Sequence, residues 1–186
     1  MDIKVHDPAT APEGSRETLN KVESAFGFIP NLMKVLAGAP PLLEAYLAIS
    51  ELFNQTSLDM TERQVVLLAT NVENRCDYCV AAHTVIARMQ KVPSDVLEAL
   101  REDRPIADGK LEALRRFTAE TVRTRGWPSE AARKRFLDAG YTSQHALEVI
   151  LGVGLKTLAN YTNHLANTPL DDAFAPGEWE AAAVAG

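Results

Sequence analysis

Residues 61–83 read TERQVVLLATNVENRCDYCVAAH, and this stretch decides both the expected fold and the expected chemistry. Residues 65–69 are apolar on most sides of a helix, which predicts a buried helix. Thr61 and Gln64 have the Thr-x-x-Gln spacing of a capping box, so this helix is expected to begin at Thr61. The apolar run then breaks, and Asn74 is suited to be the N-cap of a second helix.

Helical signals continue along the rest of the chain, and no alternating strand pattern persists. Glycine and proline fall at expected helix ends. Gly152 and Gly154 lie inside a long apolar segment, where they would let another helix approach closely. The chain is therefore expected to be all-α and to form one domain over residues 1–186. Further helices are expected over residues 41–53, 93–100, 111–124, 128–137 and 142–166.

The two central helical units match each other when the sequence is shifted by 81 residues. Thr61 then aligns with Thr142, and His83 aligns with His164. This match predicts an internal duplication that would give a compact, pseudo-symmetric helical domain. Chance similarity between two buried helices is the alternative. The expected half-repeats cover about residues 41–92 and 110–173.

Composition limits the classes of function. A formal net charge of −6 argues against general nucleic-acid binding. No apolar run reaches the roughly 18 residues of a membrane span, and the first residues lack the apolar stretch of a secretory signal. A cytoplasmic protein without nucleic-acid or membrane partners is therefore expected. No glycine-rich phosphate loop follows a strand, so no flavin, haem or nucleotide cofactor is expected.

The chain has only two cysteines, Cys76 and Cys79. A disulfide closing so short a loop would constrain the unfolded chain very little, so these cysteines are expected to be reactive or metal-binding. On a helix, Cys76, Cys79 and His83 share one face. A helix N-terminus favours thiolate over thiol, and His83 could take a proton from Cys79 or stabilise its anion. This arrangement suits a dithiol in which one sulfur attacks and the other resolves the adduct.

Two other interpretations of the same residues stay open. Zinc binds thiolates and imidazoles, and His164 is the attractive candidate for its fourth ligand. However, structural zinc sites usually gather ligands from two separate knuckles, and there is no second cysteine pair. Alternatively, both cysteines are buried bystanders.

The pattern Cys76-x-x-Cys79-x-x-x-His83, together with the helix that precedes it, resembles alkylhydroperoxidase D (AhpD) and its relatives in the carboxymuconolactone decarboxylase superfamily. The likeness extends to FGFIPN at residues 26–31, to NYTNH at 160–164 and to TPLD at 168–171. The resemblance implies a helical fold and a homo-oligomer. It also implies reduction of organic hydroperoxides, or disulfide exchange with a peroxiredoxin or another thiol donor.

Carried onto this sequence, the resemblance makes Cys79 the thiolate next to His83, with Cys76 as its disulfide partner. The family's proton-relay glutamate falls on Gln64. A glutamine can orient a water or the imidazole, but it cannot take a proton. The alternative interpretation of Gln64 is the capping-box partner of Thr61.

Four further residues are candidates for a supporting role. Glu73 could fold back towards the thiols, whereas Glu62 is turned away on its helix. Tyr78 stands where AhpD itself has a histidine, and it either packs or donates a hydrogen bond to a bound peroxide. His164 is either a structural histidine or a second histidine that faces the site.

The residue at position 64 also separates the expected functions. A thiol-dependent peroxidase or disulfide oxidoreductase is the leading expectation. Because Gln64 cannot act as a base, the alternative is a redox-sensing or binding protein with weak turnover. The decarboxylation that names the superfamily does not depend on a C-x-x-C pair, so the cysteines argue against it.

Overall fold

The computed structural model describes residues 2–181, which form nine α-helices and one 3-10 helix and contain no strand. The all-α expectation is confirmed. None of the helices in this range is long and apolar enough to cross a membrane. In chain order the elements are α1 (Glu13–Phe26), α2 (Asn31–Leu36), α3 (Pro40–Asn54), α4 (Met60–Glu73), α5 (Asp77–Met89), α6 (Ser94–Arg101), α7 (Gly109–Arg123), α8 (Glu130–Asp138), α9 (Ser143–Ala166) and η1 (Asp172–Gly177).

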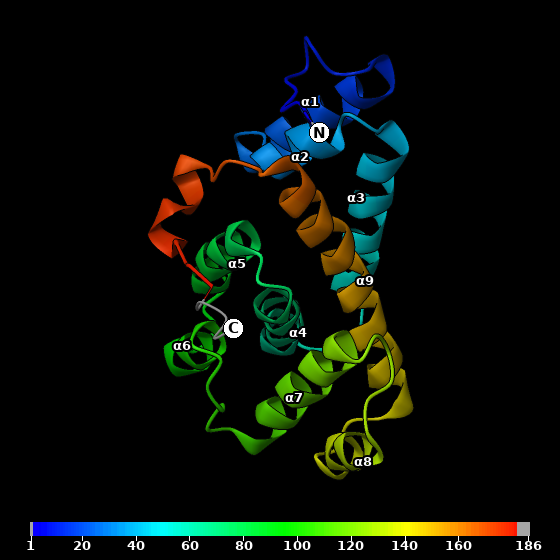
Figure 1. Ribbon diagram of the computed structural model, residues 1–186, viewed down its shortest axis with the longest axis vertical. Coiled ribbons are helices and arrows are strands. Elements are labelled where there is room, and N and C mark those ends of the chain that lie inside the picture. The colour runs from blue at the N-terminus through cyan, green and yellow to red at the C-terminus, as the bar shows by residue number, and fades with distance from the viewer. Residues whose placement is uncertain (1, 182–186) are drawn as a thin grey trace.

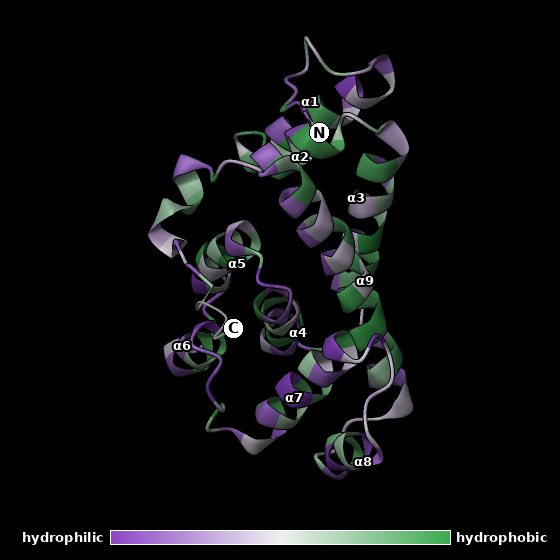
Figure 2. Cartoon of the chain, in the orientation of Figure 1, coloured by the Kyte–Doolittle hydropathy of each residue, from purple (hydrophilic) through white to green (hydrophobic). Residues whose placement is uncertain are grey.

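Helix α4 lies at the centre of the fold and packs against α5, α6, α7 and α9 (Figure 1). Helices α1 and α2 cover one end of the molecule, and α8 lies at the other end. Long hydrophobic stretches run along α3 and α9, which pack against each other (Figure 2). The buried face of α4 includes Val65, Val66 and Leu68, so the expectation of a buried central helix is confirmed.

The start of α4 differs from the expected one. Asp59 is the N-cap: its carboxylate accepts from the Glu62 N–H at 2.8 Å, and the Glu62 carboxylate accepts from the Asp59 N–H at 2.9 Å. The expected capping box of Thr61 and Gln64 is therefore wrong. An aspartate N-cap with glutamate at the third helical position satisfies the free N–H groups as well as the expected threonine and glutamine would. The helix therefore has its N-cap two residues before Thr61.

The connection between α4 and α5 also differs from the expected one. Asn74 ends α4 as its C-cap and does not begin α5. Arg75 then adopts a left-handed backbone with φ of 57°, and Cys76 becomes the N-cap of α5. The Cys76 N–H donates to the carbonyl of Asn71 at 2.9 Å. The left-handed residue reverses the chain, so the new helix starts two residues later than expected.

In the second half, α9 is one unbroken helix, whereas the aligned segment of the first half contains two helices and a break. Thr142 is the N-cap of α9 and forms a capping box with His145. Thr61 lies inside α4, so the expected pairing of two capping threonines is wrong. The internal duplication itself remains a prediction from the sequence.

After α9 the chain returns across α5 as η1. A Cβ atom on Gly177 would lie 2.2 Å from the carbonyl oxygen of Ala81, so only glycine fits against α5 here. The Arg101 guanidinium donates to the carbonyls of Gly177 and Glu178, each at 2.8 Å. These bonds hold the segment after η1 over α5 and α6.

The two glycines of α9 face different surroundings. A Cβ atom on Gly152 would lie 2.7 Å from side-chain atoms of both Phe53 in α3 and Val66 in α4. A Cβ atom on Gly154 would meet nothing within 4 Å. The expected close helix approach is confirmed at Gly152 and wrong at Gly154.

We predict that Gly152→Ala lowers the free energy of unfolding by about 1–3 kcal/mol, because the added methyl overfills a packed interior. Gly154→Ala is the matched control. It should stabilise the protein by up to about 1 kcal/mol, because alanine has a higher helix propensity than glycine at an exposed position within a helix. Denaturant unfolding measures both. Equal effects at the two positions would contradict the packing described here.

Candidate functional site

Both cysteines lie at the N-terminal turn of α5. Cys76 is the N-cap and Cys79 is the third helical residue. Both are free thiols that expose about 1% of their surface. The unpaired N–H groups and the positive end of the helix dipole at this turn favour a negatively charged sulfur. The expected common location of the two sulfurs at a helix start is therefore found.

Asparagines from α4 and α9 surround Cys79. The Asn163 amide donates to the sulfur of Cys79 at 3.2 Å and approaches the sulfur of Cys76 at 3.9 Å. The Asn71 amide donates to the Cys79 carbonyl at 3.3 Å, and the Asn160 amide donates to the Asn71 side-chain oxygen at 2.9 Å. Three helices are thereby tied together around one sulfur.

A buried lysine is the strongest electrostatic feature of the site. Lys156 extends from α9 and exposes 1% of its surface. Its ammonium lies 3.0 Å from Nε2 of His83, and its charge acts on Cys79. A fully buried lysine is rare unless it is paired with an anion. The Cys79 thiolate supplies that anion.

The two thiols differ strongly in acidity. Burial by itself raises the pKa of Cys79, but the hydrogen bond from Cys76, the charge of Lys156 and the Asn160 and Asn163 amides outweigh burial and lower this pKa to about 6. The hydrogen bond to Cys79, together with burial, raises the pKa of Cys76. At neutral pH the pair therefore holds one proton, on Cys76, and one negative charge, on Cys79.

His83 contacts Lys156 rather than a sulfur. Because an ammonium group can only donate, Nε2 of His83 accepts from Lys156, and the ring proton lies on Nδ1. Nδ1 is 3.1 Å from Oε1 of Gln64, whose amide donates to Gln90 at 2.9 Å. Burial and the charge of Lys156 lower the pKa of His83, so the imidazole is neutral. Gln64 thus contacts the imidazole, which is one of the roles that the sequence left open for it.

Tyr78 has a structural partner. Its hydroxyl donates to the Asp171 carboxylate at 2.6 Å and accepts from the Leu32 N–H at 3.2 Å. The same carboxylate accepts from the Asn31 N–H at 3.1 Å. Tyr78 therefore links α5 to the start of α2 and to the segment after α9. Tyr78 also lines the pocket described below, and its hydroxyl proton is already donated to Asp171.

The two candidate relay carboxylates are engaged elsewhere. Glu62 accepts from Lys110 at 2.7 Å and from the Tyr141 hydroxyl at 3.0 Å, in addition to its capping role. Glu73 forms a two-pronged ion pair with Arg123, with both contacts at 2.9 Å. Neither carboxylate has a hydrogen bond to a cysteine or to His83 in these contacts, so neither replaces the relay glutamate.

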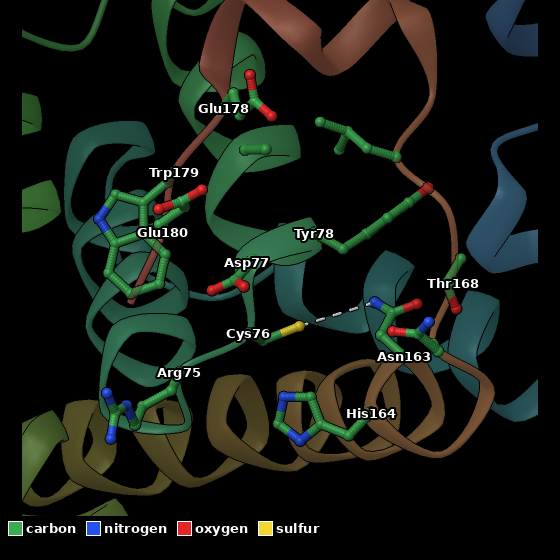
Figure 3. A pocket seen from close by; sticks show the side chains of 13 residues that line it. Arg75, Cys76, Asp77, Tyr78, Asn163, His164, Thr168, Glu178, Trp179 and Glu180 are labelled. Atoms are coloured by element: carbon green, nitrogen blue, oxygen red, sulfur yellow. Dashed lines mark hydrogen bonds between the residues drawn. The ribbon is translucent and has the colours of Figure 1, made fainter. Parts of the chain in front are cut away.

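A pocket of about 310 Å³ opens beside Cys76 (Figure 3). Of the two cysteines, Cys76 lines the pocket and Cys79 is not among its lining residues. His164 from α9 forms part of the wall, as the alternative of a second histidine facing the site anticipated. The segment after η1 forms the opposite wall through Glu178, Trp179 and Glu180. A small molecule in this pocket would meet the sulfur of Cys76 first.

His164 is exposed and stacks on Tyr161 with a ring-centroid distance of 6.5 Å, so it is not a buried structural histidine. Within residues 2–181, no three histidine, cysteine, aspartate or glutamate side chains are grouped so that they could hold a metal ion. The position next to Cys79 and His83 is taken by the Lys156 ammonium, and a second cation there would be repelled.

Lys156 and Asn163 are the functional residues that the motif did not identify. Together with Asn160 they occupy positions i, i+4 and i+7 of α9, which place them on one face. The signal for Lys156 was present in the sequence, since it is the only charged residue among the mainly apolar residues 149–159. A lysine in a buried helix requires a partner, and the C-x-x-C motif supplies the chemistry of that partner.

We predict that substitutions at Asn163 raise the pKa of Cys79 in a fixed order. Asn163→Leu removes the amide donor and should raise this pKa. Asn163→Asp places a carboxylate beside the sulfur and should raise it further, because a like charge disfavours the thiolate. The ultraviolet absorbance of the thiolate, followed against pH in the reduced protein, measures both. A pKa that is unchanged in Asn163→Asp would contradict the geometry.

Comparisons with known proteins agree with this fold. Residues 40–120 match the carboxymuconolactone decarboxylase family. A peroxidase-related protein with the alkylhydroperoxidase AhpD core, from Ralstonia eutropha JMP134, is 23% identical with a TM-score of 0.79, and the match covers 92% of each chain. A peroxidase-related protein from Silicibacter sp. TM1040 is 19% identical with a TM-score of 0.78, over 94% of this chain and 92% of that one.

A cysteine-to-alanine variant of the debrominase Bmp8, in complex with 2,3,4-tribromopyrrole, is 13% identical with a TM-score of 0.78 over 94% of each chain. No curated protein matches the sequence. The structural likenesses establish the fold, and the family match falls on the segment that contains both cysteines and His83. The chain therefore has the AhpD-like fold of these structures, and its residues 40–120 match the carboxymuconolactone decarboxylase family.

Proposed function

We propose that this protein is a thiol-dependent oxidoreductase that reduces organic hydroperoxides through Cys76 and Cys79. The observation that carries the proposal is that the two cysteines differ in charge and in position. Cys79 holds a thiolate beside Lys156, and Cys76 lines the pocket. A nucleophile of lowered pKa next to a partner that can resolve its adduct is the arrangement that reversible thiol oxidation requires.

The reaction follows from the charges on the two sulfurs. The Cys79 thiolate attacks the terminal peroxide oxygen, so an S–O bond forms, the O–O bond breaks, and the alkoxide takes a proton to leave as an alcohol. Cys76 then attacks the Cys79 sulfur and loses its own proton, forming the disulfide and releasing water. An external thiol donor, such as a peroxiredoxin or a small dithiol, returns two electrons and two protons.

Two observations favour a second candidate, a redox sensor with slow turnover. Both sulfurs are almost fully buried, and Gln64 cannot act as a base beside His83. Such a protein would form the same disulfide once and then be reduced slowly. The two candidates differ in the rate of the second half of the cycle and not in the chemistry of the first.

We predict that the reduced protein consumes cumene hydroperoxide and loses two free thiols per chain. Cys76→Ser and Cys79→Ser should each abolish disulfide formation. The rate of the first oxidation should be about tenfold lower at pH 5 than at pH 7, because a thiol with a pKa of about 6 is mostly protonated at the lower pH. Stopped-flow kinetics with thiol counting measures these quantities.

The variant Met89→Leu, at an exposed position at the end of α5, is a suitable control and should behave as the parent protein. Unchanged hydroperoxide consumption in Cys79→Ser would contradict the proposed function. Multiple turnovers with a dithiol donor identify a peroxidase. One rapid oxidation followed by slow reduction identifies the sensor.

A further inference from the structure

We propose that Lys156 is the proton carrier of the dithiol site: it keeps its proton while Cys79 is a thiolate, and releases it through His83 when Cys76 and Cys79 form a disulfide. This inference rests on the thiol chemistry of the proposed function. In this proposal Lys156 on α9 carries the proton in place of the family's relay glutamate, whose position is occupied here by Gln64.

The first step concerns charge. In the reduced protein, the Cys79 thiolate is the negative charge that acts most strongly on the Lys156 ammonium, which lies 3.0 Å from Nε2 of His83 on the same helix α5. The other titratable groups that act on it are Cys76 and His83 from α5 and Tyr46 from α3. Burial raises the pKa of Tyr46, so its phenol is neutral near pH 7. His83 is neutral as well, which leaves the thiolate as the counter-ion of Lys156.

The second step concerns oxidation. A disulfide carries no charge, so its formation removes that counter-ion. A lysine that is buried without an anion loses its proton near neutral pH, since such groups have pKa values of about 5–6. The Lys156 side chain exposes only 1% of its surface, so water does not replace the lost anion. Neutral lysine is the stable form beside the disulfide.

The third step is the exit path. The Lys156 Nζ lies 3.0 Å from Nε2 of His83, which is an acceptor. His83 is partly exposed, whereas Lys156 is buried. A proton that enters at Nε2 makes the ring an imidazolium, which can then give up its Nδ1 proton. Gln64 holds the ring in this orientation through its bond to Nδ1.

The protons and electrons balance. The reduced site contains the Cys76 thiol, the Cys79 thiolate and the Lys156 ammonium. Oxidation to the disulfide gives two electrons to the hydroperoxide and releases two protons, one from Cys76 and one from Lys156. The hydroperoxide takes up the same two electrons and two protons as it becomes an alcohol and water. Without release from Lys156, only one proton would leave.

The equilibrium of the protein with dithiothreitol tests this count. Between about pH 6.5 and 8, the pH lies below the ordinary thiol pKa of about 8.5. Reduced dithiothreitol is therefore mostly protonated and exchanges two protons together with its two electrons. If the protein also exchanges two protons, its equilibrium constant with dithiothreitol is independent of pH. If Lys156 keeps its proton, this constant changes tenfold per pH unit, or about 30 mV for a two-electron couple. Alkylation of free thiols after equilibration measures the constant.

Variants at Lys156 separate charge from proton release. Lys156→Arg keeps a cation but cannot release a proton at these pH values, so its constant should change tenfold per pH unit. Lys156→Met removes the cation and should lose the thiolate absorbance at pH 7. His83→Asn should slow disulfide formation while leaving the pH-independence of the constant intact, because it removes the path and not the carrier.

The proposal is supported if the parent protein shows thiolate absorbance at pH 7 together with a pH-independent constant. A tenfold change per pH unit in the parent protein overturns it, and so does a pH-independent constant without thiolate absorbance. If Lys156→Arg fails to fold, these two measurements on the parent protein still decide the question. No hydroperoxide is used, so a protein that passes this test but does not consume hydroperoxide would contradict the proposed function alone.

Discussion

The buried pairing of the Lys156 ammonium with the Cys79 sulfur is the interaction on which the rest of the site depends. Each member would be unfavourable without the other, because burying an isolated charge costs several kcal/mol. Together they place one negative and one positive charge between α5 and α9. The hydrogen bond from Cys76 and then the charge of Lys156 lower the pKa of this thiol although it is almost fully buried.

This pairing makes α9 part of the site rather than a scaffold. The helix supplies Lys156, Asn160 and Asn163 from one face, and His164 reaches the pocket wall beside Cys76. Gly152 lies one turn before Lys156 and lets α9 pack closely against Phe53 and Val66. Close packing at this glycine brings the lysine within reach of α5. The fold therefore positions the cation as accurately as the cysteine motif positions the sulfurs.

The fold class and the two sulfurs could be predicted from the sequence, because helical periodicity and the C-x-x-C spacing are local signals. Helix boundaries were less predictable. Asp59 competed with Thr61 for the N-cap, and a left-handed Arg75 moved the start of α5 past Asn74. Thr and Asn are good caps in general, but which residue acts as the cap depends on where the chain must turn.

The long-range partners were not predictable from local patterns. Lys156 lies 73 positions after His83, and spacing within one helix gives no information on which sulfur or imidazole it will meet. Its position in the sequence predicts that Glu73 could lie near the thiols. In the structure its carboxylate instead pairs with Arg123 on α7. Gln64 is explained only once its partner His83 and the adjacent lysine are seen together.

The most direct measurement of the central claim is the protonation state of Lys156 itself. Nuclear magnetic resonance of its side-chain nitrogen reports whether the group is an ammonium or an amine. The account predicts an ammonium in the reduced protein at pH 7 and a neutral amine in the disulfide form at the same pH. An ammonium that persists after oxidation, or an amine that is already neutral in the reduced protein, would contradict it.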